Sequence, residues 1–296
     1  MRSGAVGQKI SIGLKAFDIV NYTILLLIAF ATLYPMYYIF IVSISSGEYV
    51  SRGLVSFIPK GITWEAYKLV FQNHDIWRSY LNTIIYTGVG TAINIMVTSF
   101  CAFPLSRKDF YGRPVFTVLI TLTMFISGGL IPLYLVINQL HMTNTIWAIV
   151  LPPAVSTYNM IIMRTFFTNV PFSLQESAYL DGANDLHIFF KIILPLSTPI
   201  LATLTLFYAV THWNSFFPAM IYLNEKAKYP VQIILRDIVV AGEFSDQGGD
   251  ITNSLNIVAV NFKYAAIIIT VVPILVVYPF LQKYFAKGVM VGAVKG

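Results

Sequence analysis

The sequence predicts an all-α, polytopic membrane protein with six transmembrane helices. Of its 296 residues, 57% are hydrophobic and 11% are charged, whereas a soluble domain carries about 25% charged residues. A chain this poor in charge cannot cover a water-facing surface, so most of its outside must face lipid. In addition, six segments are long and apolar enough to cross a bilayer core, which takes about 20 residues of helix. The six segments are 17–44, 79–105, 115–137, 145–167, 194–222 and 264–281.

The first of these segments could be mistaken for a signal peptide. Arg2, Lys9 and Lys15 precede the first one, and 29–31 (Ala-Phe-Ala) resembles a cleavage site. The apolar run continues to Ile44, however, far beyond the 7–15 residues of a signal peptide core. We therefore expect an uncleaved first helix.

Lysine and arginine positions predict the orientation. They occur in the N-terminal tail, in the short turn after the second segment and in the C-terminal tail, whereas the turn 138–144 has none. Because short cytoplasmic connections are enriched in these residues, both termini are predicted to be cytoplasmic, with 47–78 and 223–263 outside. This distribution also accounts for the net charge of +6, so nucleic acid is not an expected partner.

The two exterior connections differ in character. Residues 59–72 are predicted to form a short surface helix with Thr63 as its N-cap. Residues 241–256 are polar and rich in glycine, which predicts a loop. We divide the chain into 1–74 (tail, first helix and exterior loop), 75–285 (the transmembrane domain) and 286–296 (a cytoplasmic tail).

The predicted spans lack the groups that ion-coupled transport and enzymatic catalysis need. Residues 79–106 and 114–163 contain no Asp, Glu, Lys or Arg, although ion-coupled transporters place such groups at membrane depth. The sequence has no phosphate-binding G-x-x-x-x-G-K-[ST] motif, and its lone cysteine and four scattered histidines predict no metal site. We therefore predict a non-enzymatic transport subunit that is driven by a partner, with an ion-coupled secondary transporter or channel subunit as the alternative.

The connection 168–193 is the most informative part of the chain. Ser173-Leu-Gln-Glu176 reads as a capping box that starts a short helix. Gly182 would end that helix in the left-handed conformation, and a second amphipathic stretch leads to Pro195. The prediction is a helix–turn–helix on the cytoplasmic surface, joined directly to two spans and suited to transmit a push from a soluble partner.

The spacing in this connection resembles the EAA loop of binding-protein-dependent ABC importer permeases. Glu176-Ser-Ala178 is followed by Gly182 and, after nine residues, by Ile192-Ile-Leu194-Pro195. The only departure is Ser177 in place of an alanine. The strings 178–183 (Ala-Tyr-Leu-Asp-Gly-Ala) and 195–199 (Pro-Leu-Ser-Thr-Pro) are typical of the carbohydrate-uptake branch. The ending 292–296 is similar to that of maltose-type second permeases, and the likeness covers about 75–296.

The resemblance implies a type I ABC importer permease of a bacterial cytoplasmic (inner) membrane. Its partners would be a second, homologous permease, an ATPase dimer, an extracytoplasmic sugar-binding protein facing 224–262, and membrane lipid. ATP and Mg would be bound by the ATPase subunits and no cofactor by this chain. The residues at the ATPase contact would be Glu176, Ser177, Ala178, Asp181, Gly182, Ile192, Leu194 and Pro195, together with Lys295 and Gly296 of the tail. The cargo would be a sugar, and the lipo-oligosaccharide/alginate-type subfamily favours an oligosaccharide, with acidic alginate-type fragments as one candidate.

A group of aromatic residues in the fifth segment is the candidate substrate path. Aromatic faces beside an amide can stack on and hydrogen-bond a sugar, although aromatic residues at helical spacing more often pack or form an interfacial belt. The candidate residues are Tyr208, Trp213, Asn214, Phe216 and Phe217, next to His212.

Overall fold

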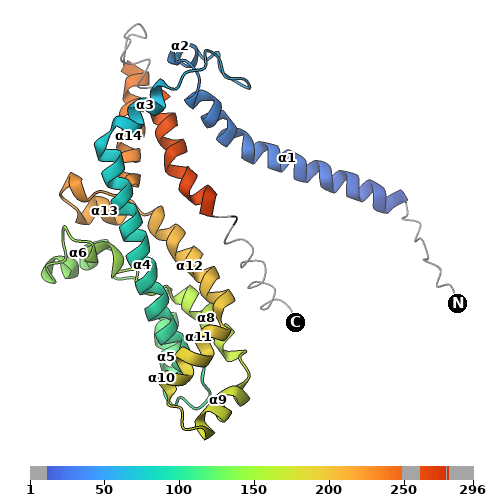
Figure 1. Ribbon diagram of the computed structural model, residues 1–296, viewed down its shortest axis with the longest axis vertical. Coiled ribbons are helices and arrows are strands. Elements are labelled where there is room, and N and C mark those ends of the chain that lie inside the picture. Colours follow the sequence, from blue (N-terminus) through green and yellow to red (C-terminus); the bar gives the residue numbers. More distant parts are fainter. Residues whose placement is uncertain (1–11, 249–260, 278, 280–296) are drawn as a thin grey trace. The chain divides into compact units, whose positions relative to one another are not determined.

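The computed structural model describes residues 12–248, 261–277 and 279, and within these ranges every regular element is a helix (Figure 1). The all-α prediction is therefore confirmed. The longer helices are α1 (Ile12–Ser43), α3 (Glu65–Gln72), α4 (His74–Ser106), α5 (Arg113–Leu122), α6 (Leu130–Gln139), α8 (Thr157–Thr168), α9 (Phe172–Leu180), α12 (Thr198–Trp213), α14 (Val231–Gly248) and a helix at Asn261–Val277. The shorter ones are α2 (Gly47–Ser51), α7 (Trp147–Val150), α10 (Asp185–Ile188), the π-helix η1 (Phe189–Ile193), α11 (Leu194–Leu196), α13 (Phe217–Tyr222) and the 3-10 helix η2 (Lys226–Lys228).

Two of the described helices are long and apolar enough to cross a membrane unbroken. They are Phe17–Ser43 and His74–Ser106, which match the first two predicted spans. A third crossing is obtained if Asp185–Leu196 and Thr198–Trp213 count as one span, although the two pieces meet at 81°. Ser197, which lies between them, is fully buried.

The third and fourth predicted spans are each divided in two. Residues 123–129 separate α5 from α6, and residues 151–156 separate α7 from α8. Gly129 has φ +85°, which a helix does not allow, and Pro152-Pro153 removes two consecutive backbone donors. The prediction of one continuous helix was wrong in both places, and in the fourth segment the break lies at Pro152-Pro153.

The fifth predicted span ends earlier than expected, and the sixth is described only in part. Residues 214–216 separate α12 from α13, which carries Pro218 in its first turn. The helix Asn261–Val277 covers most of the predicted span 264–281. The predicted tail contacts Lys295 and Gly296 lie outside the described residues.

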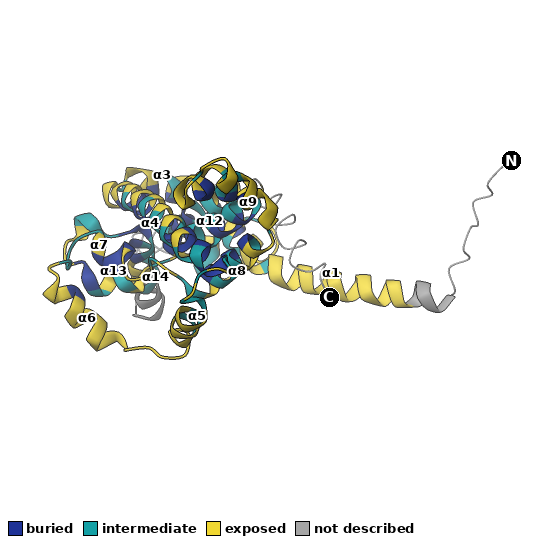
Figure 2. Ribbon diagram, turned by 90° about the horizontal axis from the view of Figure 1, so that it is seen from below, coloured by how far each residue is buried: buried dark blue, intermediate teal, exposed yellow. Residues whose placement is uncertain are grey.

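The chain divides into two compact units, of which the first comprises residues up to 70 and 241–268. In it α1 is exposed along most of its length (Figure 2), with Leu26 70% exposed. Near its end Ile41 and Val42 pack against Val55. The Thr63 hydroxyl accepts a hydrogen bond from the Glu65 N–H at 3.3 Å, in line with the predicted cap.

Helix α14 overturns part of a loop prediction. Residues 241–248 are helical and continue the amphipathic helix that begins at Val231, whereas the glycine-rich composition had predicted a loop over 241–256. Once a helix is nucleated, each added residue contributes a hydrogen bond at little further cost. Residues 249–256 lie outside the described part.

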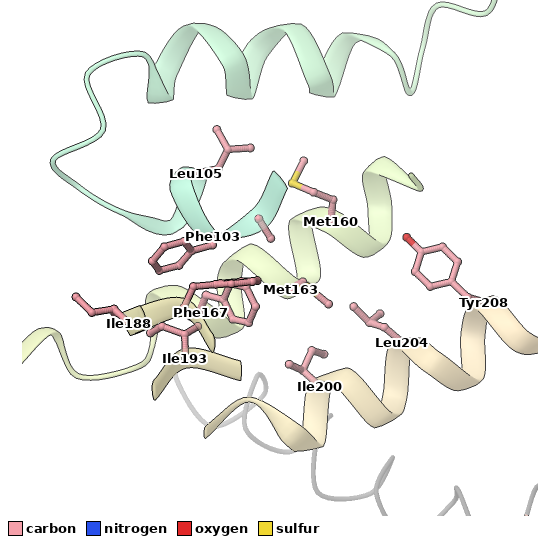
Figure 3. Close-up of a cluster of buried hydrophobic side chains, with 12 residues drawn as sticks. Phe103, Leu105, Met160, Met163, Phe167, Ile188, Ile193, Ile200, Leu204 and Tyr208 are labelled. Carbon is pink, nitrogen blue, oxygen red and sulfur yellow. The ribbon is translucent and has the colours of Figure 1, made fainter. Parts of the chain in front are cut away.

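The second unit comprises residues 71–240 and those from 269 onward, and it is organised around α4. Helix α12 packs along α4, with α8 against both (Figure 1). Between them lies a core to which α10 and η1 also contribute (Figure 3). Its buried members are Ala102, Phe103, Leu105, Met160, Met163, Phe167, Ile188, Phe189, Ile193, Ile200, Leu204 and Tyr208. The core therefore joins the 168–195 connection to the helices of the bundle.

Candidate functional site

The 168–195 connection begins differently from the prediction. Helix α9 starts at Phe172, directly after Pro171 at φ −54°, and no side chain caps it. Ser173 thus lies inside the first turn, where its carbonyl accepts from the Ser177 hydroxyl at 3.0 Å. The predicted capping box of Ser173 with Glu176 was wrong, because a capping serine precedes the first helical residue and Ser173 follows it.

The end of α9 follows the prediction closely. Gly182 adopts φ +81°. Its N–H donates to the Tyr179 carbonyl at 3.0 Å, and the Ala183 N–H donates to the Ala178 carbonyl at 2.9 Å. These two bonds form a Schellman motif, which satisfies carbonyls left free at a helix end. The turn after α9 is therefore a defined structure.

The second half of the connection is capped as well. The Asn184 side chain accepts from the His187 N–H at 2.8 Å and starts α10. Helix α10 runs directly into the π-helix η1, then α11, and the chain turns by 81° at Ser197 into α12. The two halves of the connection are thus joined by a structured turn, and the second half continues into the bundle.

The structure divides the predicted contact residues into two groups. Ala178, Ile192 and Leu194 are half-buried and pack against the core described above. The others are exposed, and they are Glu176, Ser177, Asp181, Gly182 and Pro195. The first group anchors the loop and the second group faces outward, so the loop presents a fixed surface.

Two adjoining hollows run along α4 and α12. The larger, about 630 Å³, is lined by residues of α4, η1 and α12, and the smaller, about 270 Å³, by α4, α12 and the helix Asn261–Val277. They share Thr87, Gly88 and Ala209, so we treat them as one groove. Among the described residues, the hydroxyls of Thr87 and Thr91 and the indole N–H of Trp213 are buried without a hydrogen-bond partner, and all three residues line the groove.

The predicted aromatic group is not brought together at this groove. Trp213 lines it. Tyr208 lies in the core, where its hydroxyl pairs with Thr98 at 2.8 Å. Phe216 and Phe217 are exposed and contact each other edge to face, with ring centroids 6.5 Å apart. Asn214 donates to its own helix at the Val210 carbonyl (3.0 Å).

Polar side chains from α4 and α12 support the break between α7 and α8. Asn94 donates its amide to the Pro153 carbonyl at 2.5 Å and pairs with His212 at 2.6 Å. The Ser156 N–H donates to the Tyr208 hydroxyl at 3.2 Å. Non-helical backbone at membrane depth is tolerated where it is buried in protein or lines a water-filled cavity, and these contacts satisfy two backbone groups of the break, the Pro153 carbonyl and the Ser156 N–H.

Asn144, between α6 and α7, forms hydrogen bonds with the segment 222–228. It has φ +59°, a conformation that asparagine tolerates better than most residues. Its N–H donates to the Tyr222 carbonyl (2.7 Å) and its amide to Glu225 (2.6 Å), while its two oxygens accept from the Asn224 N–H (3.2 Å) and from Lys228 (3.0 Å). The hydrogen bond from Asn144, and then that from Lys228, lowers the pKa of Glu225. These hydrogen bonds hold the start of the segment that begins at Asn224 against the turn at Asn144.

No cluster of metal ligands occurs in the part of the chain that the structure describes. Residues 90–291 match the family described as "Binding-protein-dependent transport system inner membrane component". The chain belongs to this family. The match includes most of the residues that line the groove, the whole 168–195 connection and the helix Asn261–Val277. It leaves the alternative of an ion-coupled secondary transporter or channel without support.

Relatives in the family align over nearly the whole chain. The polygalacturonan/rhamnogalacturonan transport system permease protein YtcP of Bacillus subtilis (strain 168) is 41% identical over 287 residues, covering 95% of this chain and 99% of the relative. The melibiose/raffinose/stachyose import permease protein MelC of the same organism is 31% identical over 91% of this chain and 94% of the relative.

A solved structure shows the same fold. It is a chain from the crystal structure of a bacterial ABC transporter involved in the import of the acidic polysaccharide alginate. The match has a TM-score of 0.85 at 37% identity and covers 93% of this chain and 99% of that chain. This binding-protein-dependent inner membrane component therefore has the fold of an ABC importer permease, as the EAA-type spacing predicted.

One residue beside the 168–195 connection was missed as a site residue. In the sequence Arg107 counts only toward the positive charge of a short turn. In the structure it contacts both halves of the 168–195 connection. A distance of more than 70 residues along the chain separates it from its partners, so no local pattern reveals the contact.

Proposed function

We propose that this permease imports an oligosaccharide and is driven by a separate ATPase dimer that docks on residues 173–195. The observation that supports the proposal most directly is the Schellman turn at Gly182, whose spacing from Glu176 and Leu194-Pro195 is that of the EAA loop. An oligosaccharide cargo is supported by the relatives, which are named as sugar permeases, and an acidic one by the pectin-type and alginate transporters among them.

The surface of the loop suits a protein partner. Leu180 is 89% exposed and Leu186 is 61% exposed, on either side of the Gly182 turn. They lie beside the exposed polar residues Glu176, Ser177 and Asp181. In the proposed topology this surface lies outside the bilayer, where large exposed apolar side chains generally mark a protein contact.

In the proposed cycle, ATP and Mg bind to the partner subunits. Closure of the ATPase dimer draws the coupling loops of this chain and of a second permease together and opens the cavity outward. An extracytoplasmic binding protein, facing the segment that starts at Asn224, then delivers its sugar, and hydrolysis resets the cavity. Lys295 and Gly296 are proposed to reach the ATPase dimer.

The groove along α4 and α12 is proposed as this subunit's share of the sugar path. Trp213 offers both an aromatic edge and an unpaired indole N–H, and the hydroxyls of Thr87 and Thr91 are unpaired in the described residues. A buried polar group without a partner costs about 1–3 kcal/mol, which sugar hydroxyls would relieve. The placement of Tyr208 in the core favours a packing role for that residue.

The test of the coupling proposal is the substitution Gly182→Val. At φ +81° a residue with a Cβ costs roughly 1–2 kcal/mol, so the turn should rearrange. We expect tagged permease to insert normally but to lose co-purifying ATPase or to hydrolyse ATP without moving sugar in proteoliposomes. Gly182→Asn, which tolerates the left-handed conformation, should largely retain activity.

Gly53 provides a matched control. It also has a positive φ, +67°, and, like Gly182, has nothing within 4 Å of an added Cβ. Gly53→Val therefore introduces a similar strain in the other unit and should leave ATPase co-purification unchanged. Wild-type co-purification and uptake in Gly182→Val would contradict the coupling proposal.

A further inference from the structure

Arg107, the first residue after α4, lies at the centre of a polar cluster. Its guanidinium donates to Asp185 at 2.5 Å and to the Tyr179 hydroxyl. It also contacts Asp109 through two donors, one of them Nε at 3.0 Å from Oδ1. In turn, the Tyr179 hydroxyl donates to Asp185. One side chain thus holds Tyr179 of α9 and Asp185 of α10 together across the Gly182 turn.

The surroundings of Arg107 favour a persistent contact. Its side chain is only 13% exposed, and the guanidinium lies 5.8 Å from the Phe103 ring centroid and 5.4 Å from that of Tyr179. Exposed ion pairs contribute little because water competes for both charges, and among the charged groups of this cluster only the carboxylates of Asp109 (56% exposed) and Asp185 (67% exposed) face water. The Arg107 guanidinium is planar, contacts both rings and pairs with the Asp109 carboxylate through two donors. It therefore loses less side-chain entropy per hydrogen bond than a lysine ammonium would.

The charges of the cluster are consistent with this arrangement. The hydrogen bond to Asp109 raises the pKa of Arg107 against the effect of burial, and the same contact lowers the pKa of Asp109. Burial raises the pKa of the Tyr179 hydroxyl, so it remains a donor at neutral pH. At neutral pH Arg107 is therefore a cation, Asp109 a carboxylate and Tyr179 a neutral hydroxyl, as these contacts require.

The position of Arg107 connects the loop to one wall of the groove. The second half of the 168–195 connection contains η1 and continues through α11 into α12, and η1 and α12 form the other wall. Without Arg107, the loop's polar link to the end of α4 in this cluster would be lost. With it, a displacement of the loop reaches α4 and α12 together.

We propose that Arg107 is a positioning residue that clamps the two halves of the coupling loop to the end of α4, so that ATPase-driven movement of the loop shifts both walls of the groove. This inference rests on the proposed function. It assigns Arg107 no contact with the ATPase or with sugar. The clamp acts through Tyr179 and Asp185.

The experiment compares Arg107→Gln, Arg107→Lys and, as a control, Lys108→Gln in the full transporter. Lys108 is the neighbouring cation in the chain and is exposed. A spin label at Ser173, on α9, in a Cys101→Ala background reports loop mobility, and proteoliposomes report ATP hydrolysed per sugar imported. Substitutions along a coupling route typically change coupling by about two- to thirty-fold.

We expect Arg107→Gln to raise label mobility and to raise the ATP-to-sugar ratio by a factor in that range. Arg107→Lys should have a smaller effect than Arg107→Gln but should not match the parent. The lysine ammonium keeps the charge but lacks the forked arrangement of donors of a guanidinium. Lys108→Gln should match the parent. Asp185→Asn, which leaves Arg107 in place, repeats the test should Arg107→Gln fail to assemble.

Three results would overturn the clamp. They are unchanged label mobility in Arg107→Gln and Asp185→Asn, raised mobility with an unchanged ATP-to-sugar ratio, or an equal effect of Lys108→Gln. The proposed function is judged separately by Gly182→Val. If that variant uncouples transport while the Arg107 variants do not, the coupling loop stands and the clamp fails.

Discussion

Gly90 allows the closest contact between α4 and α12. A Cβ added at Gly90 would lie 2.5 Å from His212 Nε2 and 2.6 Å from its Cε1. Real Cβ atoms do not approach a ring this closely, so Gly90→Ala must displace the imidazole. The imidazole is the partner of Asn94 at 2.6 Å, and Asn94 in turn satisfies the Pro153 carbonyl at the break between α7 and α8.

The expected loss can be worked from these contacts. Forcing an extra methyl into a packed interface costs about 1–3 kcal/mol, and leaving the Asn94 oxygen without a donor costs about 1–3 kcal/mol more. Alanine regains about 1 kcal/mol of helix propensity relative to glycine. The net destabilisation should be about 1–5 kcal/mol, which corresponds to a lowering of the unfolding temperature by roughly 2–20 °C.

The assay uses Cys101, the only cysteine of the chain, which is half-buried and packs against the core cluster. A thiol-reactive dye should label it at a lower temperature in Gly90→Ala than in the parent protein. Gly88→Ala is the matched control, because an added Cβ there meets nothing within 4 Å. In a His212→Ala background, Gly90→Ala should cost much less. Equal effects of Gly88→Ala and Gly90→Ala, or an undiminished cost in that background, would refute the reasoning.

Two further predictions concern the sugar path and the orientation. Trp213→Ala should weaken uptake about fivefold, since stacking on an aromatic face contributes about 1 kcal/mol. Trp147 is half-exposed and lies outside the groove, so Trp147→Ala should leave uptake unchanged. Normal transport kinetics in both variants would place the sugar path elsewhere. In a Cys101→Ala background, Ser51→Cys should react with an impermeant thiol reagent in intact spheroplasts and Leu180→Cys only after permeabilisation, and the reverse pattern would invert the proposed topology.

The features predicted well from the sequence are those set by local chemistry. An apolar run over 79–105 predicts a span because its length and composition suffice, and α4 covers it. Gly182 was predicted to adopt a left-handed conformation because it follows a short helix, and it has φ +81°. The start of the same helix was mispredicted, because Pro171 and the Ser173 pattern are competing local signals and the sequence alone does not rank them.

The features that were missed depend on contacts between distant segments. Apolar composition over 145–167 predicts a continuous helix, yet the break after Leu151 persists because Asn94 and Tyr208 satisfy its backbone. Aromatic spacing could not separate Tyr208, which is in the core, from Trp213, which lines the groove. Arg107 could not be identified from the sequence for the same reason, since its function in the clamp depends on the distant residues Tyr179 and Asp185.

The π-helix η1 is where the coupling loop and the groove share residues. Phe189 and Phe190 line the groove together with Phe100 of α4, and the ring centroids of Phe100 and Phe189 lie 5.0 Å apart. Phe189 also belongs to the core that anchors the loop. A π-helix has i→i+5 hydrogen bonds, occurs mostly as a single turn inside an α-helix and is frequent at functional sites. The 81° bend then follows directly at Ser197.

A displacement of α9 and α10 must therefore be absorbed within a few residues of the groove, either by rotating Phe189 and Phe190 against Phe100 or by changing the bend. Either movement would alter the width of the groove at the end nearest the loop, so under the proposed function the same residues would transmit the displacement and line the sugar path.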